Sequence, residues 1–419
     1  MQLPVHKLST KQGVPVYIEH YPDVVVPMSI MLCMMSGSAD DGDAGVNGLH
    51  HWGEHLPFRG TVSFPQGPSQ IMGHLSHLGG YANAMTQQKN TVYIAVAPKT
   101  HWRDAAERVV EMAARPLNRP EDIEAERTII GQEINQGNAN IDRRNFYHIL
   151  RSLWSGHPFG RNMVGSSESL AVMDLAAIER MHKVSYGCER CSIFLAGDLD
   201  PDEVMVYVEQ LLERMPTGVS PRHIPHVYDP LPAWQGGVPG VEESEFDASI
   251  VTLAFPMPAY DLVSDTDNVY TLLGALFTVG MLDSPLYRIV RGERQLAYHT
   301  SASSYGSRNG GVFRLAAKTS RDKVDEVVRA FWDVIHLPEL RSQERWDLVR
   351  ETMIARHTMR LPNPEEGTSR MLDSLMDSCA VENEDRAFER LLSVPRATVF
   401  AELDKMIEQT GRVITLLGK

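Results

Sequence analysis

The sequence predicts an α+β fold in two halves, and three observations support this prediction. The chain has 419 residues, which is too long for one ordinary hydrophobic core. Residues 216–240 are rich in proline and glycine and have no apolar period, so this segment is expected to be a linker. Each side of it mixes strand-like and helix-like patterns and ends on an apolar strand. We therefore expect domains at residues 1–215 and 241–419, and the shared ending suggests a duplication.

The elements of each half follow from apolar runs, alternation and turn residues. Short apolar runs predict strands, longer periodic segments predict helices, and Ser69 is expected to cap a helix. In the first half we expect strands at Val14–Ile18 and Val24–Met35, a helix around residues 51–55, a helix from Ser69 to about Leu78, a strand at Thr91–Val96, helices at Trp102–Ala114 and about Pro120–Trp154, and a strand at Ser192–Ala196. In the second half we expect a strand at Ser249–Phe255, helices near Asp267–Gly280 and Arg321–Ile335, and a final strand at Arg412–Leu417.

Composition narrows the class of protein. Hydrophobic residues make up 43% and charged residues 22%, as in soluble globular proteins. The net charge of −14 argues against a nucleic-acid partner. No apolar run approaches the ~18 residues of a membrane span. The N-terminus lacks the apolar segment of a signal peptide, so a cytoplasmic location is expected, and a periplasmic one stays open if such a peptide has been removed.

The four cysteines say less about function than composition does. Cys188 and Cys191 form a C-x-x-C pair, but no second pair completes a tetrahedral metal site. We expect incidental thiols rather than a redox or metal pair. Cysteine usage also favours a reducing compartment, weakly.

Residues 51–55 read HWGEH, an H-x-x-E-H pattern. On a helix, residues advance by ~100°, so His51 and His55 lie ~40° apart on one face. Two imidazoles at this spacing can reach one tetrahedral Zn²⁺. Glu54 lies ~60° from His51, where it can reach a metal-bound water without being a ligand. Taken alone, the pattern is equally compatible with a polar helix end.

The flanking residues decide between these interpretations. Residues 48–61 read GLHHWGEHLPFRGT, which resembles the G-x-x-H-x-x-E-H-x-x-F-x-G-T signature of the pitrilysin, insulinase and mitochondrial processing peptidase family of zinc proteases. That family takes its third zinc ligand from a Glu in an E-x6-E pattern further along the chain. Residues 126–133, ERTIIGQE, have this spacing, with 77 residues between His55 and Glu133. The resemblance implies Glu133 as the ligand and Glu126 as a carboxylate that orients a His.

Two further segments continue the resemblance, which extends from about Lys7 to the C-terminus. Residues 79–86, GGYANAMT, are similar to a family segment whose Asn lies close to the scissile bond, which implies substrate contacts at Asn83 and Ala84. The resemblance also implies that the alternating strand Thr91–Val96, which follows, is an edge strand that pairs with the substrate backbone. Residues 284–298, SPLYRIVRGERQLAY, are similar to the segment that carries a substrate-contacting Arg and Tyr, which implies Arg291 and Tyr298.

The resemblance implies two homologous domains, each a mixed, mainly antiparallel sheet covered by helices. It implies a zinc endopeptidase with one Zn²⁺ per chain that cleaves peptides inside a closed chamber. In relatives with four domains, the Arg and Tyr come from the last domain and meet the zinc site of the first. We therefore expect a homodimer with shared sites, and a heterodimer with a related subunit stays open.

Three other functions are compatible with parts of the sequence. A non-catalytic or partner-dependent scaffold subunit is the main alternative, although the ligand set is intact. A lyase that cleaves S-ribosylhomocysteine also carries H-x-x-E-H, but it is one short domain with a Cys ligand. A binding module without chemistry is the third.

The motif departs from the family pattern at three positions. Gly53 stands where the family usually has a bulky apolar residue. In a helix interior, Gly lowers helix stability by ~1 kcal/mol relative to Ala. Pro57 is expected to kink or end the helix. His50 lies four residues before Glu54 on its face, so it is expected either to hydrogen-bond Glu54 and tune its pKa, or to pack at the helix start.

Overall fold

The computed structural model describes residues 3–42, 47–224, 228–234, 240–260 and 265–419. The chain forms two compact units. Unit 1 consists of Met1–Ala139, Arg161–His226 and Pro362–Asp385, and unit 2 of Asn140–Gly160, Val227–Leu361 and Arg386–Lys419. Each unit therefore contains a segment from the other half of the sequence. The domain and linker bounds expected from the sequence stay a prediction.

Unit 1 is built on a six-stranded sheet with the order β1-β2-β6-β3-β5-β4. Its strands are β1 (Val5–Ser9), β2 (Pro15–His20), β3 (Met28–Met34), β4 (Tyr81–Thr86), β5 (Thr91–Ala97) and β6 (Cys191–Gly197). Only the β2–β6 pair is parallel within it. The central strand β3 is buried throughout because both faces of the sheet are covered: Ile30 and Leu32 belong to one core and Met31 and Cys33 to another.

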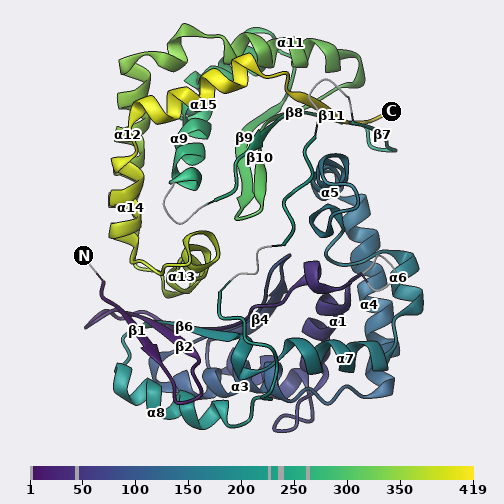
Figure 1. Cartoon of the computed structure of the whole chain (residues 1–419), viewed down its shortest axis with the longest axis vertical. Coiled ribbons are helices and arrows are strands. Elements are labelled where there is room, and N and C mark those ends of the chain that lie inside the picture. The colour runs from purple at the N-terminus through teal and green to yellow at the C-terminus, as the bar shows by residue number, and fades with distance from the viewer. Residues whose placement is uncertain (1–2, 43–46, 225–227, 235–239, 261–264) are drawn as a thin grey trace. The chain divides into compact units, whose positions relative to one another are not determined.

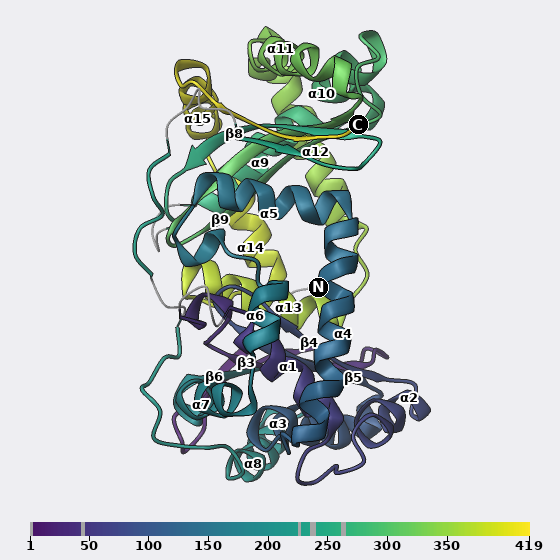
Figure 2. The ribbon, with the colours of Figure 1, turned by 90° about the vertical axis from the view of Figure 1, so that its right-hand side faces the viewer.

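Helices cover both faces of this sheet. Helix α3 (Trp102–Ala114) packs against β3 and β5, and α13 (Pro364–Ser378) packs against β6 and β3 on the other face (Figure 1). Helix α4 (Pro120–Ala139) runs alongside α1 (Leu49–His55) (Figure 2). The helices of unit 1 are α1 (Leu49–His55), α2 (His74–His77), α3 (Trp102–Ala114), α4 (Pro120–Ala139), α6 (Ser167–Val172), α7 (Leu175–Ser185), α8 (Pro201–Leu212) and α13 (Pro364–Ser378).

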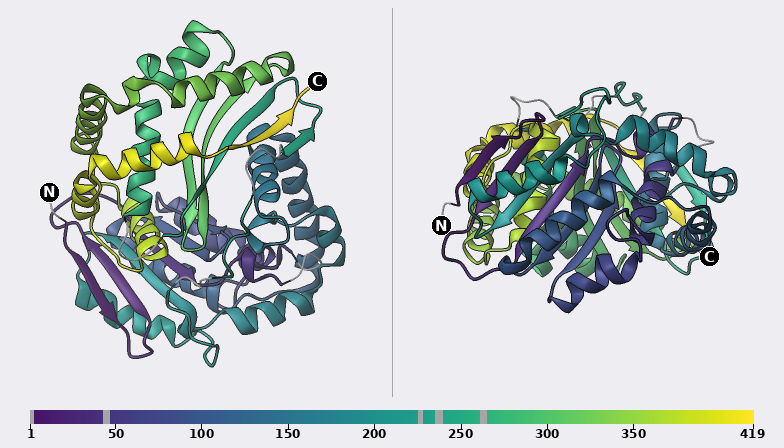
Figure 3. Two further views of the ribbon diagram at one scale, coloured as in Figure 1. Left: turned by 45° about the horizontal axis from the view of Figure 1, so that its top comes forward. Right: turned by 90° about the horizontal axis from the view of Figure 1, so that it is seen from below.

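Unit 2 repeats the strand topology of unit 1. Its sheet has the order β7-β11-β8-β10-β9, with β7 and β11 parallel and all other pairs antiparallel. The strands are β7 (Gly240–Glu243), β8 (Ser249–Met257), β9 (His299–Ser307), β10 (Gly310–Thr319) and β11 (Arg412–Leu417), and the green β9–β10 hairpin is visible in the left view of Figure 3. If β1 is left aside, the strands of unit 1 follow the order β2-β6-β3-β5-β4. In both units the sheet therefore places the first strand next to the last, followed by the second, the fourth and the third. The predicted α+β fold with two homologous domains is thereby confirmed.

The helices of unit 2 pack around a core of its own, which α9, α11 and α15 share with the sheet. These helices are α5 (Ile141–Leu153), α9 (Thr266–Thr278), α10 (Pro285–Tyr287), α11 (Val324–Ile335), α12 (Gln343–Thr358), α14 (Glu384–Ser393) and α15 (Arg396–Glu408). Among the helices of the described ranges, none has the length and apolarity needed to cross a membrane.

Three expected elements differ from the structure. The strand expected at Val24–Met35 is Met28–Met34, and it begins just after Pro27, which has no N–H to donate to a neighbouring strand. The helix expected at about 120–154 is two helices, because Asn140 has an extended backbone and its side chain caps α5 by accepting from the Arg143 N–H. Ser69 does not cap its helix: the preceding Pro68 is the N-cap, and Ser69 begins a π-helical turn that continues into α2.

Candidate metal centre

The short helix α1 carries the H-x-x-E-H residues. It begins after Gly48, whose φ of 97° is a left-handed conformation that glycine adopts without strain. It ends at His55, and a 3₁₀ turn that contains Pro57 follows. A Cβ at Gly53 would lie 2.5 Å from the terminal methyl of Met181, a flexible side chain that can move away. The helix thus ends where Pro57 was expected to end it.

His51, His55 and Glu133 each present one ligand atom within 4.8 Å of the others. The Nε2 atoms of His51 and His55 lie 3.5 Å and 3.6 Å from the same Glu133 oxygen. Zinc ligands at 2.0–2.2 Å in a tetrahedron are separated by about 3.4 Å, so the two imidazoles and the carboxylate fit a Zn²⁺. Among the described residues, no other group of His, Cys, Asp and Glu side chains has such a geometry.

Glu126 holds the far side of one of these imidazoles. Its carboxylate bonds His55 Nδ1 at 2.9 Å and accepts a hydrogen bond from Arg59 Nε. With Nδ1–H as the donor, the Nε2 lone pair of His55 faces Glu133. Burial acts to raise the pKa of Glu126, but the hydrogen bonds from His55 and Arg59 outweigh it and hold that pKa below its ordinary value. Glu126 is 4% exposed, so it is not part of a solvated acidic face.

Glu54 lies beside the candidate zinc ligands and has a hydrogen-bond partner of its own. Its carboxylate accepts a hydrogen bond of 2.6 Å from the Thr86 hydroxyl, and the residue is 8% exposed. Burial raises the pKa of Glu54 above its ordinary value, although the Thr86 hydroxyl and the charge of His55 act to lower it. A carboxyl with a raised pKa is suited to accept and return a proton near neutral pH.

His50 does not interact with Glu54 through its side chain, which corrects the first expectation for this residue. Its Nδ1 lies 2.6 Å from Asp41 and its Nε2 lies 2.9 Å from the Ser36 hydroxyl. The imidazole is packed at the helix start, the alternative considered from the sequence. The partner of Glu54 is Thr86, the last residue of the GGYANAMT segment.

Asn83 and Ala84 lie on β4, which is the edge strand of the unit 1 sheet and pairs only with β5 among its strands. The strand expected at the edge, Thr91–Val96, is instead β5, which lies between β3 and β4. Strand β4 alternates, so the Asn83 side chain is exposed whereas Ala84 is 9% exposed and contributes to the core. Any substrate contact at Ala84 would therefore involve the main chain.

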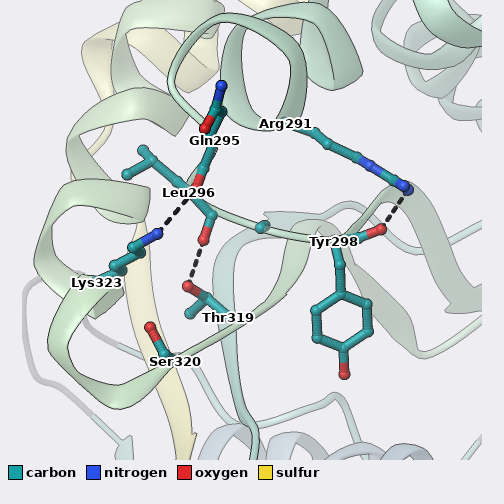
Figure 4. A pocket seen from close by; sticks show the side chains of 8 residues that line it. Arg291, Gln295, Leu296, Tyr298, Thr319, Ser320 and Lys323 are labelled. Atoms are coloured by element: carbon teal, nitrogen blue, oxygen red, sulfur yellow. Dashed lines mark hydrogen bonds between the residues drawn. The ribbon is translucent and has the colours of Figure 1, made fainter.

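Arg291 and Tyr298 lie together in unit 2, at a pocket of about 370 Å³ (Figure 4). Arg291 donates a hydrogen bond of 2.5 Å to the main-chain oxygen of Tyr298, a residue that is 54% exposed. The Tyr298 ring points away from Lys323, which bonds the carbonyl of Gln295. Gln295 has a left-handed φ of 51°, a strained conformation for a non-glycine residue. The pocket is lined by Arg291, Gln295, Leu296, Ala297, Tyr298, Thr319, Ser320 and Lys323.

The thiols of Cys188 and Cys191 are free and buried. Burial raises the pKa of Cys188 to about 11 and raises that of Cys191 well above its ordinary value. Neutral thiols are poor nucleophiles and poor metal ligands, which favours the interpretation as incidental cysteines.

Two family models match the chain. Residues 20–167, which include the metal centre, match the Insulinase (Peptidase family M16) model, and residues 173–338 match the Peptidase M16 inactive domain model. The chain therefore belongs to the M16 family of peptidases, the family that contains insulinase.

Named relatives agree with this assignment. An uncharacterized zinc protease of Rickettsia bellii is 24% identical over 75% of this chain and 73% of its own length. An uncharacterized zinc protease of Mycobacterium tuberculosis is 27% identical over 77% and 72%. A probable mitochondrial-processing peptidase subunit beta of Schizosaccharomyces pombe is 26% identical over 51% and 48%.

Solved structures share the fold. A protease from Helicobacter pylori matches with a TM-score of 0.86 and 16% identity over 100% of both chains. Pitrilysin matches with a TM-score of 0.73 and 17% identity, and the match covers 100% of this chain but 45% of pitrilysin. The present chain thus corresponds in length to about half of pitrilysin.

Proposed function

We propose that the protein is a zinc-dependent endopeptidase with one Zn²⁺ per chain that cleaves peptides or small unfolded proteins inside a closed chamber. The observation that carries this proposal is the convergence of His51, His55 and Glu133, with separations of 3.5 Å and 3.6 Å from the imidazoles to one carboxylate oxygen. Membership of a family whose relatives are named zinc proteases supports it.

The chemistry follows from the residues around the ligands. A bound zinc ion would supply a Lewis acid for the scissile carbonyl and would make water a stronger acid. Glu54 accepts a proton from the attacking water and delivers it to the nitrogen of the leaving amine, so that the C–N bond breaks and the carboxylate is regenerated. Glu126 holds His55 in the tautomer that a ligand requires.

Substrate binding is proposed to use a sheet edge. An extended peptide added to β4 would bond main chain to main chain, with Asn83 exposed beside it, and such pairing accepts many sequences. Arg291 and Tyr298 would hold the substrate carbonyl and stabilise its developing charge.

A homodimer is proposed because one chain carries both sets of residues. Pitrilysin is about twice the length of this chain, since 45% of it matches. Two copies facing each other in a closed two-fold dimer would supply the same number of domains and two equivalent sites.

The alternative is a non-catalytic or partner-dependent scaffold subunit of a heterodimeric peptidase. The inactive-domain model over residues 173–338 and the relative described as a subunit beta favour it. Metal analysis and digestion of a mixed peptide library, read by mass spectrometry, separate the two. We expect one zinc per chain and cleavage that a chelator abolishes and zinc restores. A protein that binds no zinc or cleaves only with a different subunit would support the alternative.

A further inference from the structure

The N-terminal end of α1 is held by a carboxylate that does not belong to the helix. Asp41 accepts hydrogen bonds from the Gly48 N–H at 2.6 Å, the His50 N–H at 3.1 Å and the His50 ring Nδ1 at 2.6 Å. The N–H groups of a first helical turn have no partner within their helix, and Gly48 at the N-cap has no side chain to supply one. Asp41 therefore caps the helix from outside.

The hydrogen-bond network extends from α1 to two other segments of unit 1. His50 Nε2 lies 2.9 Å from the Ser36 hydroxyl, and Ser36 donates a 2.9 Å bond to Asp40. Asp40 accepts from Arg222, which also bonds the Met35 carbonyl at 3.2 Å. We call this set the α1 clamp; its members are Ser36, Asp40, Asp41, His50 and Arg222. It joins the end of β3, the start of α1 and the segment that follows α8.

A nucleophilic role is excluded for this set. Ser36, His50 and Asp41 follow each other like a serine, its base and an orienting carboxylate. Ser36 and His50 are 0% exposed and Asp41 is 2% exposed. A hydroxyl that no substrate can reach cannot act as a nucleophile, so the network acts by fixing positions.

We propose that the α1 clamp positions the zinc ligands, with His50 as its central positioning residue. Helix α1 has seven residues and contains Gly53, so it is too short and too flexible to fix its own rotation. His50 precedes the ligand His51 by ~100° of rotation, so a fixed direction for the His50 ring also fixes the direction of His51. Ligands of a metal site must be held within about 0.5 Å of their positions. This inference rests on the zinc site of the proposed function.

The test measures zinc affinity rather than activity. The dissociation constant of zinc for the full chain is determined by competition with a chelator, for wild type, His50→Ala and His50→Asn. His50→Ala is expected to weaken zinc binding by about tenfold or more, the size seen for groups that orient ligands. Asn retains a donor where Nδ1 faced Asp41, so His50→Asn is expected to recover most of the affinity. The visible spectrum of the Co²⁺-substituted protein is expected to change in His50→Ala.

His148→Ala is the matched control. His148 is also a buried imidazole, 6% exposed, and it pairs with a carboxylate, Glu242, at 3.1 Å, but it belongs to unit 2. Thermal unfolding of the metal-free proteins sets a temperature at which all variants are folded, and binding is measured there. The control is expected to lose stability and to keep the wild-type zinc affinity and Co²⁺ spectrum.

The outcomes separate the clamp from the proposed function. If wild type binds zinc and cleaves peptides, and His50→Ala binds zinc within twofold of wild type with an unchanged Co²⁺ spectrum, the clamp proposal is overturned alone. If wild type binds no zinc, the proposed function fails and the clamp proposal fails with it. Should His50→Ala not fold, Ser36→Ala replaces it; a weaker zinc affinity supports the clamp, and an unchanged one overturns it.

Discussion

Replacing Glu126 by Gln removes a charge beside the metal centre with little change of shape. The Glu126 carboxylate bonds His55 Nδ1 at 2.9 Å, and its side chain is 6% exposed. The Nδ1–H of His55 is a stronger donor when its Nε2 carries a cation, so this bond strengthens on zinc binding. A Gln at this position can still accept the hydrogen bond from His55 through its neutral amide oxygen, but the bond loses the contribution of the carboxylate charge.

The expected magnitude follows from typical hydrogen-bond energies. A hydrogen bond to a charged group contributes about 1.5–3 kcal/mol and a neutral one about 0.5–1.5 kcal/mol. The difference of about 1–1.5 kcal/mol corresponds to zinc affinity weakened about tenfold. This value lies at the lower end of the range of about 10–100-fold for such partners.

The assay is a competitive zinc titration at fixed pH, with Glu124→Gln as the matched control. Glu124 lies on the same helix, but its side chain is 71% exposed and pairs with Arg127. The control is expected to bind zinc like wild type. If Glu126→Gln also binds within twofold of wild type, Glu126 does not orient His55 and the reasoning is refuted.

Two other predictions concern the base and the assembly. Glu54 must be ionised to accept a proton, and the Thr86 hydroxyl lowers its pKa, so Thr86→Val is expected to move the acid limb of the kcat/KM profile to higher pH; an unmoved limb would contradict this role. Glu54→Gln and Tyr298→Phe are each expected to be inactive, yet after random subunit exchange activity should return towards a quarter of wild type, because a mixed dimer with shared sites contains one site without defects. No recovery despite demonstrated exchange would show that Tyr298 acts within its own chain or that the partner is a different protein.

Local spacing predicts six of the strands and the two zinc-binding histidines, whereas β1, β4, β7, β9 and β10 were not expected and Glu133 was implied by the resemblance. Apolar runs mark the strands, and helical periodicity places His51 and His55 on one face. The segment 362–385 was not predictable as part of unit 1, since it is held there by contacts remote in sequence. Arg370 pairs with Glu19, and Thr368 bonds Ser29 at 2.9 Å.

The supporting residues of the site were harder to predict for the same reason. Thr86 meets Glu54, and Asp41 meets His50, only through the packing of β4 and of a loop against α1. Thr86 is the last residue of the GGYANAMT segment, but the resemblance implies no role for it. His50 shares a helical face with Glu54, and that periodicity left both alternatives open, because it cannot show that a carboxylate outside the helix, Asp41, bonds the imidazole.

The central claim is that this chain hydrolyses peptides with zinc as cofactor and Glu54 as the proton acceptor. The most direct measurement compares zinc content and peptide cleavage in wild type, Glu54→Gln and the control Glu124→Gln. Gln matches Glu in shape and is not a ligand here, so Glu54→Gln should keep about one zinc per chain while turnover falls by several orders of magnitude. Glu124→Gln should match wild type in both. Cleavage by Glu54→Gln at a rate near that of wild type would contradict the claim.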